Sequence, residues 1–197
     1  PAYLKLRTTS CCVPPDRPDS STTADPAPRT PDHFTGPDGA ADAVVIVVTH
    51  NSADCLGALI ESLRAETADL TLRVVVADNS SSDGTLEFVH SRYPDVLAFA
   101  TGGNLGYSGG INAAMRRAGA AATVVVLNPD LTVERGSLTS MMRRLQASQA
   151  GAVVPRLLNP RGQTSFSLYR EPTIPTAAGD ALLGRRAPNR PDWLSGT

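Results

Sequence analysis

The chain has 197 residues, a hydrophobic fraction of 41% and a formal net charge of −1 at pH 7. This length allows one globular domain and a tail. Nucleic acid is not an expected partner, because its binding needs a basic surface or a platform of aromatic side chains, and only 5% of the residues are aromatic. The three cysteines form no C-x-x-C pair, which favours a reducing, cytoplasmic setting over a disulfide framework.

Residues 1–42 are predicted to be a disordered extension rich in proline, serine and threonine. Half of the 16 prolines lie there, and the segment offers little apolar surface to offset the entropy of ordering. The domain is therefore expected at residues 43–197. No transmembrane segment is predicted within the chain, because the longest aliphatic run, residues 43–48, is far shorter than the ~20 residues that span a bilayer.

Strands and helices are predicted to alternate from residue 43 onward. Residues 43–48 are a continuous run of apolar, mostly β-branched side chains, which is typical of a strand buried on both faces. The next segment carries leucines at helical spacing after Ser52, a candidate helix N-cap. Further strands are expected at residues 72–77, 96–99, 123–127 and 152–154, and further helices after Asp83, from Ser108 and around residues 138–145. This order predicts βαβ units and an α/β fold with a mostly parallel sheet flanked by helices.

The segments that follow the first four strands are rich in small polar and acidic residues. They are Thr49-His50-Asn51, residues 78–84, the glycine-rich residues 102–110 and Asn128-Pro129-Asp130. In a parallel sheet, ligands bind beyond the carboxyl ends of the strands, where such segments gather. This edge of the sheet is therefore expected to bind a polar, phosphorylated ligand.

Three other motifs fit the strand ends less well. A dinucleotide-binding Rossmann domain needs G-x-G-x-x-G at its first strand–helix turn, and residues 49–54 contain no glycine. The Gly-Lys-Ser/Thr of a P-loop does not occur in the sequence. Residues 106–110 do match G-x-S-x-G, the nucleophile elbow of α/β-hydrolases. However, Ser108 lies several residues after its strand and all three histidines precede it, so Ser108 is interpreted as a helix N-cap.

Taken together, the strand ends resemble those of family 2 glycosyltransferases, which have the GT-A fold, a Rossmann-like nucleotide-sugar-binding domain. The resemblance rests on four motifs in the family's order and spacing, at residues 47–52, 76–85, 104–112 and 127–130. A later stretch, residues 154–158 with Gly162 and Pro172, is similar to the rhamnosyltransferase branch. The match covers roughly residues 43–184 and implies that residues 43–197 hold the N-terminal, donor-binding portion of a glycosyltransferase domain.

The resemblance also implies roles for the residues that match the family's motifs. The nucleotide-sugar-binding set is Thr49, Asn51, Asp78, Asn104, Gly109, Asn112 and Asn128. Within it, Thr49 and Asn51 would line the nucleotide pocket, and Asp78 would accept a hydrogen bond from the imide N–H of uracil or thymine. Asp130 would bind Mg²⁺ or Mn²⁺ at the position of the family's D-x-D metal motif, where Asn128 replaces the first acid. The alternative for residues 128–130 is an ordinary turn that ends a strand.

The function that the resemblance implies is inverting, metal-dependent transfer of a sugar, with rhamnose as the candidate, to a cell-surface glycan or a lipid-linked acceptor. The donor would be a dTDP- or UDP-sugar, and the enzyme would be cytoplasmic, with a peripheral position at the inner face of the cell membrane as one option. The family's catalytic base follows a Trp-x-x-Gly-like segment, and the sequence stops at Trp193-Leu194-Ser195-Gly196-Thr197, so no base is named and no transfer by this chain alone is expected. Two alternatives stay open, a nucleotide-binding module without catalysis and an α/β-hydrolase that uses Ser108.

Overall fold

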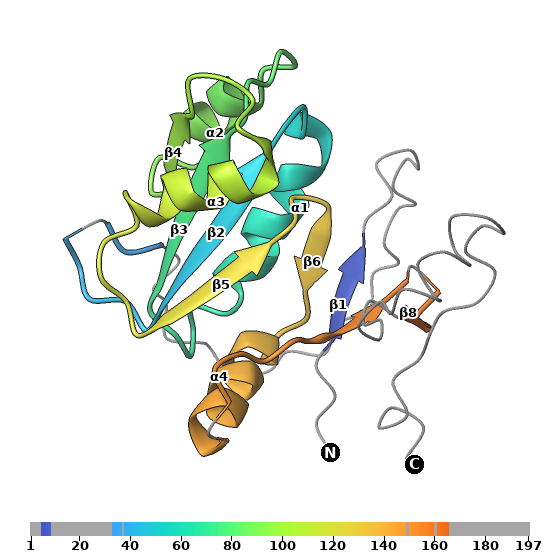
Figure 1. The fold of residues 1–197 in the computed structure, drawn as a ribbon. Helices are drawn as coiled ribbons and strands as arrows, with labels where there is room; N and C mark the ends of the chain where they lie inside the picture. Colours follow the sequence, from blue (N-terminus) through green and yellow to red (C-terminus); the bar gives the residue numbers. More distant parts are fainter. Residues whose placement is uncertain (1–4, 9–32, 37, 149, 160, 166–197) are drawn as a thin grey trace, which may run out of the picture.

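The structure of the chain is a computed structural model, which describes residues 5–8, 33–36, 38–148, 150–159 and 161–165. Its main sheet has four parallel strands in the order β4-β3-β2-β5 (Figure 1). These strands are β2 (Ala43–Thr49), β3 (Leu72–Asp78), β4 (Leu97–Ala100) and β5 (Thr123–Leu127). Every residue of the two central strands, β2 and β3, is buried, which accounts for their continuous apolar sequence.

Helices cover both faces of the main sheet. They are α1 (Ala53–Arg64), α2 (Thr85–Arg92), α3 (Gly106–Met115) and α4 (Ser137–Ala147). On one face, Val45 of β2 packs in a core with Leu56 of α1 and with residues of α2 and α4. On the other face, Ile46 of β2 packs in a second core with Ala114 of α3. Successive side chains of a strand point to opposite faces, so β2 contributes to both cores. The predicted α/β class, with a mostly parallel sheet flanked by helices, is confirmed.

Helix α3 lies unusually close to the sheet at one point. A Cβ atom at Gly110 of α3 would come within 2.6 Å of Cγ1 and 3.0 Å of Cγ2 of Val48 on β2. Val48 is a β-branched residue of a buried strand, so its side chain has little freedom to move aside. The absence of a side chain at Gly110 therefore sets the distance between α3 and β2.

A second, smaller sheet has the strand order β6-β1-β7-β8. Its strands are β6 (Leu131–Val133), β1 (Lys5–Thr8), β7 (Arg156–Leu158) and β8 (Thr164–Ser165). Strand β1 pairs antiparallel with β6 and parallel with β7. Residues 152–154, expected to form a strand, are irregular, and the strand forms a few residues later as β7. The prediction missed this position because β7 pairs with β1, a partner about 150 residues away in sequence.

Parts of the segment that was expected to be disordered are ordered against the domain. Besides β1, the structure describes residues 33–36, where the backbone N–H of Thr35 donates to the carbonyl of Leu72 at 2.8 Å. The side chain of Phe34 is buried in the core, with 2% of its surface exposed. A single aromatic residue in a proline-rich segment produces no periodic pattern, so the sequence gives no signal for this contact. The rest of the segment, residues 1–4, 9–32 and 37, lies outside the described residues, and the domain boundary at residue 42 stays a prediction.

Arg73 of β3 holds the described residues around Gly36 and Gly39 against the domain through hydrogen bonds. Arg73 is 2% exposed, and its guanidinium group donates to the carbonyl oxygens of Gly36 at 3.0 Å, Ala118 at 2.5 Å and Gly39. A buried guanidinium needs acceptors for its N–H groups, and here backbone carbonyls provide them. Gly36 and Gly39 are therefore integral to the folded domain.

Helix α3 begins at Gly106, two residues before Ser108. Ser108 is exposed within the first turn of the helix, so its predicted role as the N-cap is wrong. The side chain of Asn104 occupies that role in part, because its Oδ1 accepts a hydrogen bond from the N–H of Gly106 at 3.0 Å. The place of Ser108 inside a helix also differs from the sharp strand–helix elbow of a hydrolase nucleophile. Across the described part of the chain, none of the helices combines the length and hydropathy of a membrane-spanning segment.

Candidate functional site

The strand ends place several of the predicted site residues on one edge of the main sheet. The chain proceeds from β2 outward to β3 and β4 and then returns to β5 on the other side of β2 (Figure 1). The strand order therefore reverses between β2 and β5, which is where open α/β sheets bind ligands. Thr49 ends β2 and Asn128 follows β5 directly, so these two residues flank the reversal.

Asp78 ends β3 beside Thr49, its register partner on β2. The Thr49 hydroxyl donates to Oδ1 of Asp78 at 2.9 Å, and the backbone N–H of Ser81 donates to Oδ2 at 3.0 Å. The Ser81 hydroxyl donates a further hydrogen bond to Oδ1. Asp78 is 3% exposed, so these three neutral donors stabilise a buried carboxylate. The contact of Asp78 with a nucleotide base stays a prediction.

Asn51 connects the loop after β2 to the loop after β3. Its backbone is left-handed, with φ of 52°, a conformation that asparagine adopts more readily than most residues. The N–H of Asn51 donates to Oγ of Ser81 at 2.8 Å, and its Oδ1 accepts from the N–H of Ser82 at 2.8 Å. The Ser81 hydroxyl thus serves Asn51 and Asp78 together. The structure brings Thr49, Asn51 and Asp78 into one hydrogen-bonded group, called the strand-end cluster below.

Asp83 accepts hydrogen bonds from the first residues of both α1 and α2, the helices that follow these loops. Its Oδ2 accepts from the N–H of Ala53, the first residue of α1, and its Oδ1 accepts from the N–H of Thr85, the first residue of α2, both at 3.0 Å. Burial acts to raise the pKa of Asp83, but the hydrogen bonds from Thr85 and Ala53 outweigh it and hold that pKa below its ordinary value. The negative charge therefore remains at the two helix N-termini, where it is favourable.

Asn79 joins three strand ends and is not among the site residues predicted from the sequence. Its backbone N–H donates to the carbonyl of Thr49 at 2.8 Å, and its carbonyl accepts from Nδ1 of His50 at 2.8 Å. Its side chain extends to the glycine-rich loop after β4, where Nδ2 donates to the carbonyl of Gly106 at 2.9 Å. An asparagine after an acid is ordinary turn chemistry in a sequence. The sequence does not reveal the role of Asn79, because the residue that its side chain contacts, Gly106, lies 27 residues further along the chain.

The predicted residues of the glycine-rich motif lie along the start of α3. Asn104 is exposed and caps the N–H of Gly106. Gly109 lies in the first turn, where a Cβ atom would come within 2.7 Å of Cβ of Leu105, so a side chain there would displace the loop. Asn112 is exposed about one turn further along the helix. Asn104 and Gly109 thus adjoin the anchored end of α3, whereas Asn112 lies beyond it.

Asn128 and Asp130 lie in the short connection between β5 and β6, where Asn128 is exposed and Asp130 half-buried. An amide oxygen and a carboxylate are hard oxygen ligands of the kind that Mg²⁺ and Mn²⁺ prefer. Within the residues that the structure describes, no three His, Cys, Asp or Glu side chains gather into a metal-binding group. The pair therefore fits an ion that also takes ligands from water and from the phosphates of a bound molecule.

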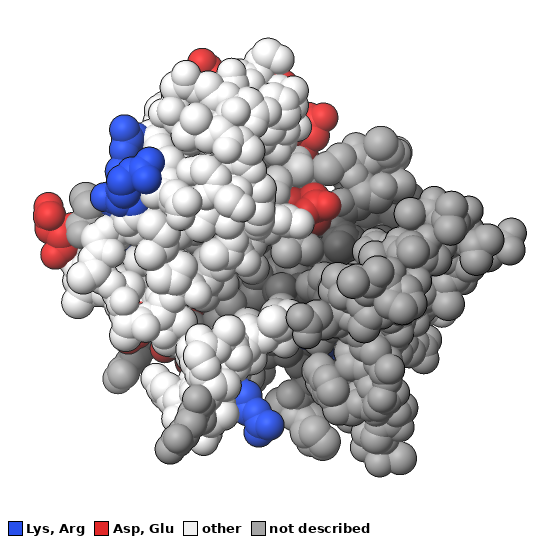
Figure 2. All heavy atoms as spheres, viewed as in Figure 1, with Lys and Arg blue, Asp and Glu red and all other residues white. Residues whose placement is uncertain are grey.

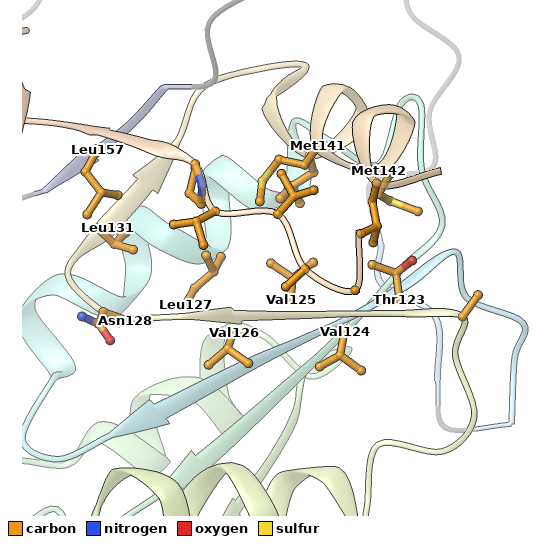
Figure 3. A pocket seen from close by; sticks show the side chains of 18 of the residues that line it. Thr123, Val124, Val125, Val126, Leu127, Asn128, Leu131, Met141, Met142 and Leu157 are labelled. Carbon is orange, nitrogen blue, oxygen red and sulfur yellow. The ribbon is translucent and has the colours of Figure 1, made fainter. Parts of the chain in front are cut away.

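A cavity of about 900 Å³ lies between β5, α4 and residues 151–155 (Figure 3). Val125 and Leu127 of β5 point into it, on the side of the strand where Met141 and Met142 of α4 lie (Figure 3). Most of the side chains that line it are apolar. Because such a lining would leave phosphate groups desolvated and unpaired, the polar edge of the sheet is the better candidate for a phosphorylated ligand.

The strand-end cluster owes its polarity to hydroxyl, amide and backbone groups around one acid, Asp78. Charged side chains are sparse on the described part of the face in Figure 2, where they form small separate groups on a mostly uncharged surface. Binding at this edge would therefore depend on hydrogen-bond geometry more than on the field of a large charged patch.

Comparison with known proteins identifies the family. Residues 44–195 match the family model described as Glycosyl transferase family 2. The N-acetylglucosaminyl-diphospho-decaprenol L-rhamnosyltransferase of Mycobacterium tuberculosis is 30% identical over 162 residues, which are 77% of this chain and 52% of the relative. The low-salt glycan biosynthesis hexosyltransferase Agl10 of Haloferax volcanii is 29% identical over 124 residues, which are 61% of this chain and 38% of the relative. The chain thus spans about half the length, or less, of these curated relatives.

Two solved structures are similar to part of this chain. S. aureus TarS 1-349 is 22% identical with a TM-score of 0.49, over 58% of this chain and 38% of that chain. The mannosyltransferase PcManGT from Pyrobaculum calidifontis, in complex with GDP-Man and Mn²⁺, is 26% identical with a TM-score of 0.45, over 59% of this chain and 36% of that chain. The match to the family model covers more than half of the present chain, so the resemblance expected from the strand ends is confirmed. The chain belongs to glycosyl transferase family 2, with similarity to its rhamnosyltransferases.

Proposed function

We propose that this chain forms the donor-binding part of a glycosyltransferase that takes a sugar from a nucleoside-diphosphate donor. The observation that carries the proposal is the reversal of strand order between β2 and β5. The strand-end cluster lies on one side of this reversal, and Asn128 and Asp130 lie on the other side. An extended polar ligand such as a nucleotide sugar could contact both sides at once.

The strand-end cluster suits a pyrimidine base that carries an imide group. A carboxylate has about four acceptor positions, and three donors already occupy positions on Asp78. The remaining position could accept the imide N–H of uracil or thymine, whereas the N3 lone pair of cytosine would face it with repulsion. Thr49 and Asn51 would line the same pocket, which favours a dTDP- or UDP-linked donor.

The start of α3 would meet the sugar and the phosphates. Gly102, Gly103 and Gly106 have open space where their Cβ atoms would lie, so a ligand can approach the backbone closely. Asn104, Gly109 and Asn112 would contact this part of the donor. Rhamnose is the proposed sugar because the Mycobacterium tuberculosis relative is named as an L-rhamnosyltransferase.

Asp130, assisted by the amide oxygen of Asn128, would hold Mg²⁺ or Mn²⁺. When bound, this ion would neutralise the charge of the departing nucleoside diphosphate. The proposed transfer is inverting: an acceptor hydroxyl forms the new bond to the anomeric carbon on the face opposite the breaking bond to the diphosphate. The base that takes the hydroxyl proton is assigned to none of the described residues.

The proposed acceptor is a lipid-linked precursor of a cell-surface glycan. The Mycobacterium tuberculosis relative is named for an acceptor in which N-acetylglucosamine is joined through a diphosphate to decaprenol. An enzyme that uses such an acceptor together with a nucleotide sugar would work in the cytoplasm, at the inner face of the cell membrane.

Calorimetric titration of wild type and Asp130→Ala with dTDP tests this proposal. With Mn²⁺ present, the variant is expected to bind dTDP about tenfold more weakly or worse, because its carboxylate acts through the ion. In chelator the two proteins should bind dTDP equally. CDP is the control nucleotide and should bind wild type much more weakly than dTDP or UDP does. Equal dTDP affinity of the two proteins in Mn²⁺ would refute the metal site, and equal affinity of wild type for dTDP and CDP would refute the role of Asp78.

A further inference from the structure

We propose that Asn79 and Thr101 are positioning residues, which hold the glycine-rich loop after β4 in the shape that receives the sugar and phosphates of the donor. The loop comprises residues 101–105, between the end of β4 and the start of α3. The inference rests on the proposed function and extends it to two residues outside the predicted site. Together they are called the loop anchor.

The side chain of Asn79 uses both ends of its amide group on this loop. Nδ2 donates to the carbonyl of Gly106 at 2.9 Å, where α3 begins. Oδ1 accepts from the hydroxyl of Thr101 at 3.0 Å and lies 3.4 Å from the N–H of Leu105. Asn79 is 3% exposed, so these bonds form away from competing water. One buried amide therefore contacts the first and the last residue of the loop.

Thr101 attaches the beginning of the loop to the end of β3. Its backbone N–H donates to the carbonyl of Asp78 at 3.0 Å. Its hydroxyl oxygen lies 3.0 Å from the carbonyl of Asp78, 3.0 Å from Oδ1 of Asn79 and 2.6 Å from the carbonyl of Gly103. A hydroxyl has one proton, which it shares among these acceptors. The loop is thereby folded back onto Asp78 and Asn79.

The loop has little else to fix its shape. Gly102 has φ of 87° and Gly106 has φ of 71°, and Cβ atoms at Gly102, Gly103 or Gly106 would meet nothing within 4 Å. Open space beside the backbone is what the approach of a ligand requires, but it also means that side-chain packing does not restrain these glycines. Glycine loses more conformational entropy on ordering than any other residue. The hydrogen bonds of the loop anchor therefore supply the restraint.

The end of β3 also holds the part of the proposed site that would bind the nucleotide base. The side chain of Asp78 bonds Thr49 at the end of β2, while that of the next residue, Asn79, bonds the loop after β4. Successive side chains of an extended strand point to opposite sides. The end of β3 thus fixes the distance between the strand-end cluster and the glycine-rich loop. Loss of the loop anchor is expected to weaken sugar and phosphate contacts while base contacts persist.

Thr101→Val and Thr101→Ser are the matched variants for the test. Valine keeps the branched shape and removes the hydroxyl, whereas serine restores the hydroxyl. The probes are dTDP-rhamnose, which would reach the loop, and dTMP, which lacks the rhamnose and the second phosphate. Both are titrated by calorimetry in Mn²⁺. We expect Thr101→Val to weaken dTDP-rhamnose binding about fivefold, the effect of one hydrogen bond. Its dTMP affinity should stay within about twofold of wild type, and Thr101→Ser should restore dTDP-rhamnose binding.

Amide hydrogen exchange at residues 102–106 gives a readout without ligand. Exchange there should be faster in Thr101→Val and in Asn79→Ala than in wild type, and unchanged in α1. Unchanged exchange in the loop would overturn the proposal, and so would equal weakening of dTMP and dTDP-rhamnose, which indicates a general loss of structure. If wild type binds neither nucleotide while loop exchange responds as expected, the donor assignment is refuted and the anchoring of the loop is supported.

Discussion

The Ser81 hydroxyl lies between two residues of the strand-end cluster. It donates to the carboxylate of Asp78 and accepts from the backbone N–H of Asn51. Removing it would leave the buried carboxylate one donor short and would leave the Asn51 N–H without its acceptor. The first loss typically costs about 1–3 kcal/mol because Asp78 is buried, whereas the N–H of Asn51 is exposed and can bond to water. Ser81 is therefore the residue on which the geometry of the cluster depends most directly.

Ser81→Ala is expected to lower the free energy of unfolding by about 1–3 kcal/mol, measured by urea denaturation at neutral pH. Ser82→Ala is the matched control. The Ser82 hydroxyl is exposed and lies 3.3 Å from Oδ1 of Asn51, a weak contact. The control should stay within about 0.5 kcal/mol of wild type. Equal stability of Ser81→Ala and wild type would show that the cluster does not depend on this hydroxyl.

At the scale of elements, Asp95 links the end of α1 to the segment that carries Phe34. Its carboxylate accepts from the guanidinium of Arg64 at 2.8 and 2.9 Å and from the backbone N–H of Phe34 at 2.9 Å. Burial acts to raise the pKa of Asp95, but the Arg64 and Phe34 bonds outweigh it and hold the pKa below its ordinary value. A carboxylate with a lowered pKa stabilises the folded state above the pKa of the unfolded chain. That contribution is lost as the pH falls through the folded-state pKa.

Asp95→Asn is accordingly expected to be less stable than wild type at pH 7 and to differ from it less in acid. The difference in unfolding free energy should shrink as the pH falls below about 4, where Asp95 of the unfolded wild-type chain begins to take up a proton, and it should be lost once folded Asp95 is protonated as well. Urea denaturation of both proteins at neutral pH and near pH 3 measures this difference. A difference of the same size at both pH values would show that the charge of Asp95 does not contribute to acid sensitivity.

The elements that the sequence could predict are those whose signal is local. Strands β2 and β3 are fully buried, so their apolar runs mark them without knowledge of their partners. Strand β7 was misplaced because its position follows from pairing with β1, far away in sequence. In the site, the family motifs selected Thr49, Asn51 and Asp78, which lie in one hydrogen-bonded group in the structure, and their contact with a ligand stays a prediction. Asn79 escaped prediction because its bonds reach a loop that only the fold brings near.

At the scale of the whole molecule, Phe34, which precedes β2, contributes to the core. Phe34 packs with residues of α1, β2 and β3, and the guanidinium carbon of Arg64 lies 4.9 Å from the centre of its ring. A cation above an aromatic face adds to the stabilisation from burial. The folded unit therefore includes Phe34, which precedes the start of the domain expected from the sequence.

Phe34→Ala is expected to lower the free energy of unfolding by about 3–5 kcal/mol, because it removes a buried aromatic side chain and leaves a cavity. His33→Ala is the control, since His33 is the exposed neighbour of Phe34 and should change stability by less than about 0.5 kcal/mol. Thermal or urea unfolding measures both. If Phe34→Ala unfolds like wild type, Phe34 is dispensable and the domain starts near residue 43, as the sequence indicated.

The close approach of Gly110 to Val48 has a consequence for the evolution of this chain. A Cβ atom at Gly110 would lie 2.6 Å from Cγ1 of Val48, so Gly110→Ala is expected to destabilise the protein by about 1–3 kcal/mol through overpacking. Val48→Ala should recover part of that loss in a double-mutant cycle, and additive effects would contradict the contact. Two residues that compensate in this way are inherited as a pair. Among homologues, a side chain at the position of Gly110 should therefore accompany a smaller residue at the position of Val48.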